Sequence, residues 1–161
     1  MEFCSAAEDD AALVCVPPYH VAGIAAVLSS VFAGRRVVQL ANFSAETWLD
    51  LARRNRVSNA FVVPTMLARI VEALEGAASA DLPQLRALSY GGGKMPLAVI
   101  ERAMALFPAT DFTNAYGLTE TSSTIAAVSY THLRAHETVL DLVCRLLLEK
   151  QKNTILPKSV T

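Results

Sequence analysis

Apolar positions along the chain form short runs that alternate with longer segments of helical spacing. Short apolar runs rich in Val, Leu and Ala are typical of strands buried on both faces of a sheet, and the longer segments predict helices that pack on it. The predicted strands are residues 12–16, 36–40, 59–63, 85–90 and 111–115, and the predicted helices are residues 21–33, 45–54, 64–74 and 96–107.

Residues at the predicted boundaries support this division. Ser44 is a good N-cap for the helix that follows it, Pro64 suits the first position of a helix, and Gly34 suits the end of one. Strands that alternate with helices over short connections favour a parallel arrangement. The sequence therefore predicts an α/β fold, with a mostly parallel sheet and helices on both of its faces.

Composition and charge narrow the class of protein. The chain has 161 residues, of which 53% are hydrophobic and 18% are charged, so it can bury a sizeable core. Its net charge of −1 gives no electrostatic reason to expect nucleic acid or anionic lipid as a partner. Cys4, Cys15 and Cys144 form neither a metal-ligand nor a disulfide pattern, which favours a reducing cytoplasm.

Residues 11–34 carry no Lys, Arg, Asp or Glu and are long enough to cross a bilayer. Pro17 and Pro18 interrupt this stretch near its start, so a buried strand followed by a buried helix is the better interpretation. The N-terminal residues are acidic, where a signal peptide carries positive charge. We therefore expect a cytoplasmic protein without an integral membrane segment.

Residues 114–120 carry the strongest candidate chemistry. The aromatic ring of Tyr116 can stack on a purine base, and Gly117 lets the chain turn close to a ligand. Thr119 can donate to a phosphate oxygen, and Glu120 supplies the hard oxygen that Mg²⁺ prefers. The alternative is an ordinary turn after a strand, with Tyr116 half-buried and Glu120 in water.

Two other segments follow predicted strands. Gly91, Gly92 and Gly93 carry no side chains, so their backbone can approach a ligand closely and offer amide donors; a tight strand-to-helix turn is the alternative. His20 lies at the carboxyl end of the first strand, where open α/β sheets bind ligands, although it could equally cap the next helix. We expect these segments to meet at one edge of the sheet.

Three stretches resemble, in the expected order, motifs of the adenylate-forming (AMP-binding) superfamily, which includes acyl-CoA synthetases, amino-acid adenylation domains and luciferases. Residues 17–23 resemble the P-x-x-H-x-x-G segment, residues 89–96 the S-x-G-G-x-x-x-P segment, and residues 114–120 the N-x-Y-G-x-T-E signature. The resemblance covers about residues 8–127. It implies a partial subdomain of the adenylate-forming fold.

The resemblance also implies a reaction, in which a carboxylic acid and ATP form an acyl-adenylate that coenzyme A then captures. Tyr116 is then expected to stack on adenine, Thr119 to bind the α-phosphate and Glu120 to hold Mg²⁺. His20 is expected beside the acyl and pantetheine tunnel and, with Thr119 and Glu120, is the expected catalytic set. The expected nucleotide contacts are Gly91, Gly92, Gly93, Asn114, Tyr116, Gly117 and Thr119. Lys94 is given no catalytic role.

Other motifs of the family are not found in this sequence: the phosphate loop, the ribose-binding aspartate segment, the hinge and the small C-terminal domain with its lysine. The sequence therefore predicts a central slice of the large domain, without adenylating activity of its own. An amino-acid adenylation domain of a nonribosomal peptide synthetase and a non-enzymatic α/β binding module are the alternatives, and the substrate acid is not readable.

From Val128 onward the sequence changes character. Residues 128–138 resemble one reading frame of a sequencing adapter, and residues 142–150 resemble the primer that follows it, so we expect 1–127 to be the family fragment and 128–161 a non-native tail. His132, His136 and Glu137 lie at helical spacing that could suggest a metal site. The adapter interpretation argues against that site.

Overall fold

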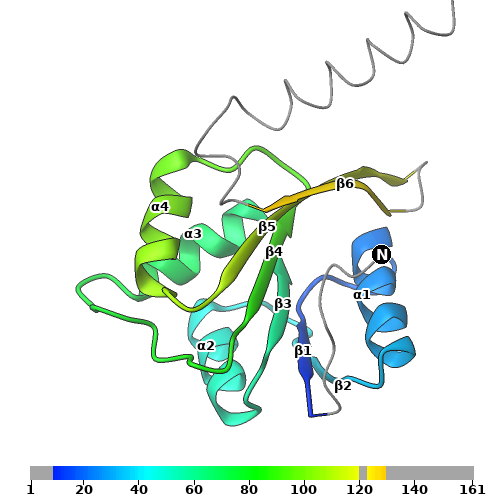
Figure 1. Ribbon diagram of the computed structural model, residues 1–161, viewed down its shortest axis with the longest axis horizontal. Helices are drawn as coiled ribbons and strands as arrows, with labels where there is room; N and C mark the ends of the chain where they lie inside the picture. The colour runs from blue at the N-terminus through cyan, green and yellow to red at the C-terminus, as the bar shows by residue number, and fades with distance from the viewer. Residues whose placement is uncertain (1–8, 120–122, 130–161) are drawn as a thin grey trace, which may run out of the picture.

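The computed structural model describes residues 9–119 and 123–129. Strands alternate with helices along most of this part of the chain (Figure 1). The strands are β1 (Ala11–Val14), β2 (Arg36–Gln39), β3 (Asn59–Val62), β4 (Ala87–Gly91), β5 (Asp111–Leu118) and β6 (Ser123–Ser129). The helices are α1 (Val21–Phe32), α2 (Ala45–Arg54), α3 (Pro64–Ala73) and α4 (Leu97–Leu106).

The strands form one sheet in the order β2-β1-β3-β4-β5-β6. Neighbouring strands from β2 to β5 are parallel, and β6 pairs antiparallel with β5. Helices α2, α3 and α4 lie on one face of the sheet and α1 lies on the other (Figure 1). The predicted α/β class, with a mostly parallel sheet and helices on both faces, is confirmed.

Helices α2 and α3 begin at the residues that the sequence predicts, because a capping residue or a proline stands at each start. The Ser44 hydroxyl accepts a hydrogen bond from the backbone N–H of Thr47 at 3.1 Å, which satisfies one of the unpaired donors at the start of α2. Pro64 occupies the first turn of α3, where its missing N–H costs nothing. These two residues fix where the chain leaves β2 and β3 to cross the sheet.

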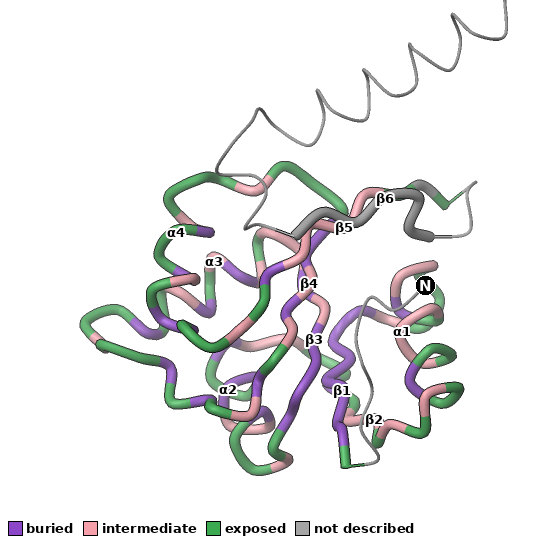
Figure 2. Tube along the Cα trace, viewed as in Figure 1, coloured by how far each residue is buried: buried purple, intermediate pink, exposed green. Residues whose placement is uncertain are grey.

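The main core lies between the sheet and helices α2 to α4. Alternate strand residues such as Leu13, Val62 and Leu88 face this side and are 0–1% exposed, as is Trp48 of α2. Figure 2 shows buried positions concentrated on the central strands β1, β3 and β4. This packing holds the carboxyl ends of the parallel strands in fixed register, which is what a site at that edge requires.

Helix α1 packs differently from the other helices. It contacts β1 and β2, yet its outer side carries large apolar residues in contact with solvent. The exposed fractions are 61% for Leu28, 67% for Val31 and 95% for Phe32. Among the described helices, none is long and apolar enough to cross a bilayer.

Two features of the sheet differ from the prediction. The fifth strand does not end at Ala115 but continues to Leu118, so residues 114–118 lie in β5 rather than after it. Strand β6 was not predicted; it pairs with β5 and supplies the hydrogen bonds that keep these residues extended. The expected boundary at Val128 falls within β6, where Val128 pairs with Asn114.

Candidate functional site

The segments singled out from the sequence lie at the same edge of the sheet, the one formed by the carboxyl ends of the parallel strands. Tyr90 pairs with Asn114, and Gly91 pairs with Ala115. The glycine segment, residues 91–93, therefore begins directly beside the two residues of β5 that precede Tyr116. Strand β1, which leads to His20, is separated from β4 by β3 alone. Since the strands are parallel, the chain leaves β1 and β4 at the same edge, where β5 carries Tyr116.

The backbone of the glycine segment comes close to its neighbours. Gly91 is buried, and a Cβ atom at this position would lie 2.3 Å from the carbonyl oxygen of Ala115. Gly92 has a φ of +81°, which turns the chain out of β4. Gly92 and Gly93 are exposed, so their amides lie at the surface of this edge. The glycine segment therefore forms a tight turn and also exposes backbone that carries no side chains. The two interpretations of the sequence, a strand-to-helix turn and a backbone open to a ligand, are compatible.

Tyr116 is half-buried near the end of β5, and Asn114 is half-buried two residues before it. Side chains two apart on a strand share a face, so both lie on the same side as the buried Phe112, toward α3 and α4. Gly117 and Thr119 are exposed. The pairing of β5 with β6 shifts register between Tyr116 and Gly117. Glu120, the expected metal ligand, lies outside the described residues.

His20 caps α1, as one of the two interpretations of the sequence predicted. Its Nδ1 accepts a hydrogen bond from the backbone N–H of Ala22 at 3.2 Å. Because an accepting nitrogen carries no proton, the neutral ring carries its proton on Nε2. The side chain is exposed, and the neighbouring Tyr19 is 91% exposed. The cap orients the ring while Nε2 stays available to a ligand.

Gly23 is a residue whose role the sequence motif did not explain. A Cβ atom here would lie 2.1 Å from the carbonyl oxygen of Pro17 and 2.7 Å from that of Val16. A glycine is therefore required for α1 to begin so close to the chain that leaves β1. This contact fixes the position of His20 at the carboxyl edge.

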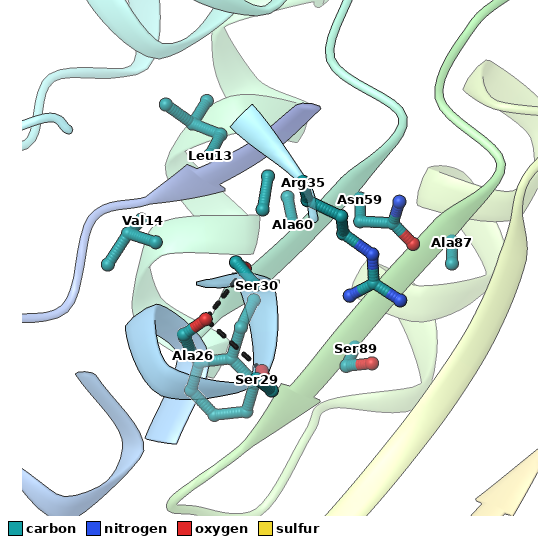
Figure 3. A pocket seen from close by; sticks show the side chains of 12 residues that line it. Leu13, Val14, Ala26, Ser29, Ser30, Arg35, Asn59, Ala60, Ala87 and Ser89 are labelled. Atoms are coloured by element: carbon teal, nitrogen blue, oxygen red, sulfur yellow. Dashed lines mark hydrogen bonds between the residues drawn. The ribbon is translucent and has the colours of Figure 1, made fainter. Parts of the chain in front are cut away.

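A cavity of about 160 Å³, which none of the sequence motifs predicted, lies between α1 and the sheet (Figure 3). Its walls include the polar residues Arg35, Asn59 and Ser89. A signal was present in the sequence, since Asn59 and Ser89 are polar positions in otherwise apolar strands. Strand alternation places them on the face opposite the main core, under α1.

The described residues offer neither a thiol nucleophile nor a metal cluster. Burial raises the pKa of the Cys15 thiol from 9.0 to about 11, so it is uncharged at neutral pH. No group of three His, Cys, Asp or Glu residues in the described part of the chain could hold a metal ion. His132, His136 and Glu137 lie outside the described residues.

The chain resembles known ligases in sequence. The family model described as AMP-binding enzyme matches residues 1–145. A 2-succinylbenzoate–CoA ligase of Bacillus pumilus (strain SAFR-032) is 35% identical over 123 residues, which are 76% of this chain and 24% of that protein. The fatty acid–[acyl-carrier-protein] ligase ScoC of Streptomyces coeruleorubidus is 35% identical over 115 residues, or 71% of this chain and 22% of ScoC.

Solved structures show the same fold. The O-succinylbenzoate coenzyme A synthetase of Bacillus subtilis, in complex with ATP and magnesium ion, superimposes with a TM-score of 0.67 at 31% identity, covering 78% of this chain and 25% of that one. The inhibitor-bound N-terminal domain of FACL13 from Mycobacterium tuberculosis gives a TM-score of 0.70 at 26% identity, with 82% and 33% covered. The chain spans about a quarter of the length of the curated relatives it matches.

Proposed function

The chain belongs to the AMP-binding enzyme family, and from this membership we propose that it is part of an ATP-dependent acyl-CoA synthetase or ligase. In the proposed reaction, a carboxylate oxygen attacks the α-phosphorus of ATP and pyrophosphate leaves. The thiol of coenzyme A then attacks the acyl carbon, and AMP leaves. The observation that carries the proposal is the register of β4 and β5, which sets the glycine segment beside Tyr116 at one edge.

In this proposal Tyr116 stacks on adenine, and Asn114, Gly117 and the backbone of the glycine segment line the nucleotide. The close approach of Gly91 to Ala115 supports this role, because it sets the backbone of the glycine segment directly beside β5. Stacking on a half-buried aromatic ring contributes about 1–3 kcal/mol per base.

Thr119 binds the α-phosphate and Glu120 holds Mg²⁺, which neutralises phosphate charge when bound. His20 lies beside the path of the acid and the thiol, with Nε2 as its free nitrogen. None of these residues acts as a nucleophile. The acid and ATP are both anions, so the proposed site accelerates their reaction by alignment and electrostatic stabilisation.

Two alternatives remain distinguishable from this proposal. An amino-acid adenylation domain shares the nucleotide motifs, but the relatives named above are ligases for coenzyme A or for an acyl-carrier protein. A non-enzymatic α/β binding module has no need of a nucleotide. We place the protein in the cytoplasm, where ATP and coenzyme A are available and its cysteines stay reduced.

The proposed nucleotide role is tested by the affinity of the chain for AMP. Replacing Tyr116 with Ala removes the stacking surface, so we expect the Kd for AMP to rise about tenfold, from the 1–3 kcal/mol of a stacked base. Tyr116→Phe keeps the ring and is the matched control, with a Kd within about twofold of the parent. Isothermal titration measures all three. An unchanged Kd in Tyr116→Ala contradicts the proposed adenine site.

We further propose that residues 1–127 are a piece of the large domain and that residues 128–161 are not native to it. The check is the parent DNA. Independent reads that cross the codon for Ala127 are expected to continue into further family motifs. Reads that reproduce the present residues 128–161 from genomic DNA contradict the non-native tail.

A further inference from the structure

The two edges of the sheet differ in the charged residues that their connections carry. The three connections that lead into β2, β3 and β4 at the amino edge each hold an arginine: Arg35, Arg56 and Arg86. The connections that leave β1 to β4 at the carboxyl edge are residues 15–20, 40–44, 63 and 92–96. Together these four carboxyl-edge connections contain no Asp, Glu or Arg and a single lysine, Lys94. Lys94 is therefore the ammonium group that they bring to the edge where Tyr116 lies.

The connection that holds Lys94 runs toward the face of the sheet on which Tyr116 lies. Residues 92–96 lead from β4 to α4, and α4 covers the same face as α3 (Figure 1). Cβ atoms at Gly92 and Gly93 would each lie 3.7 Å from a side-chain atom at the start of α3, so the turn before Lys94 contacts that helix. Because β4 and β5 are neighbouring strands, about 4.8 Å apart, Lys94 and Tyr116 lie at the same edge and toward the same face.

The Lys94 side chain makes no contact of its own within the described part of the chain. It is exposed, and no described residue accepts a hydrogen bond from its ammonium or forms an ion pair with it. Arg102 of α4 is different, since its guanidinium donates to the carbonyl oxygen of Ala77 at 3.0 Å. The Lys94 ammonium has three N–H donors on a flexible four-carbon stem, so it can turn toward a ligand held at this edge.

A nucleotide at this edge brings negative charge that the aromatic ring does not neutralise. Stacking on Tyr116 holds the base, whereas the phosphate needs donors and a positive charge. The exposed amides of Gly92 and Gly93 offer donors without net charge. An ammonium forms shorter and stronger hydrogen bonds with phosphate oxygens than a neutral donor does. Lys94 is the residue of the described carboxyl-edge connections that can supply this contact.

We propose that the Lys94 ammonium binds the phosphate of the nucleotide whose base stacks on Tyr116. The inference rests on the proposed nucleotide function and adds a binding residue to it. Position 94 is unspecified in the S-x-G-G-x-x-x-P segment, so the contact belongs to the residue that this chain carries there and not to the motif.

The test compares AMP with adenosine, which lacks the phosphate, by isothermal titration of the 161-residue chain at low salt. The parent is expected to bind AMP about fivefold more tightly than adenosine, the effect of one charge-assisted contact at an exposed site. In Lys94→Met this preference is expected to disappear, because the Kd for AMP rises about fivefold while the Kd for adenosine stays unchanged. Lys94→Arg keeps the charge and is expected to keep most of the preference.

Arg102→Met is the matched control, because it removes one positive charge from α4 and leaves the carboxyl edge unchanged. Both Kd values of this variant are expected to stay within about twofold of the parent, since salt screens charges that are not in contact. An equal loss of AMP binding in Arg102→Met and Lys94→Met reflects net charge alone and overturns the inference. A loss in Lys94→Met that adenosine shares overturns it too.

The parent chain also provides a test that needs no variant. Equal affinity for AMP and adenosine in the parent overturns the inference and leaves the proposed base site intact. If neither ligand binds, the proposed nucleotide function is rejected and the inference with it. Circular dichroism checks that Lys94→Met folds, and Lys94→Gln takes its place if it does not. An AMP preference that survives in the folded variant overturns the inference.

Discussion

At the residue scale, Gly91 shows how the site depends on backbone contact. Its missing side chain lets β4 approach the Ala115 carbonyl, 2.3 Å from where a Cβ atom would be, and this approach sets the glycine turn beside Tyr116. The atom in the way belongs to the backbone of a paired strand, so it cannot rotate aside. Any side chain at this position must therefore push β4 and β5 apart.

Gly91→Ala is accordingly expected to lower the free energy of unfolding by about 3 kcal/mol, the upper range for overpacking a fitted interior. Gly93→Ala is the matched control, because its Cβ atom would meet the Pro64 ring at an ordinary 3.7 Å. That variant is expected to stay within about 0.5 kcal/mol of the parent. Urea denaturation followed by circular dichroism measures both, and equal stability of the two variants contradicts the close-approach argument.

At the scale of elements, the sequence predicted most of the sheet because each signal was local. Apolar runs located the parallel strands, and Ser44 and Pro64 marked helix starts that the structure confirms. Strand β6 and the extension of β5 to Leu118 were missed, because both depend on pairing between two segments and not on either segment alone. The residues 123–129 are small and polar at their ends, which gives a weak strand pattern.

The candidate site, like the sheet, was predicted from the sequence only in part. Motif spacing located the glycine segment, His20 and Tyr116, and the parallel register then placed all three at one edge. The cavity with Arg35 was not predictable, because Arg35 lies outside the motifs and reaches the space under α1 only through the packing of that helix. The polar residues Asn59 and Ser89, which line the same cavity from β3 and β4, are recognisable in the sequence once the two faces of the sheet are known.

At the scale of the whole molecule, the chain contains the proposed adenine contacts of the reaction centre but not all of the groups that the superfamily uses to neutralise charge. Transfer of an adenylyl group from ATP places large negative charge in the transition state, and cationic groups must neutralise it. In the superfamily that this chain resembles, a phosphate loop and a lysine of a small C-terminal domain contribute to this, and neither motif is found in the sequence.

We therefore expect the 161-residue chain to bind AMP without catalysing exchange between pyrophosphate and ATP. The measurement is incorporation of labelled pyrophosphate into ATP with a carboxylic acid such as 2-succinylbenzoate present. A full-length 2-succinylbenzoate–CoA ligase with its own acid serves as positive control, and the heat-denatured chain sets the background. We expect AMP binding without catalysis because stacking on Tyr116 needs only one edge of the sheet. Neutralising the charge of the transition state needs groups from several segments at once. Acid-dependent exchange above background shows instead that the 161-residue chain is sufficient for the chemistry.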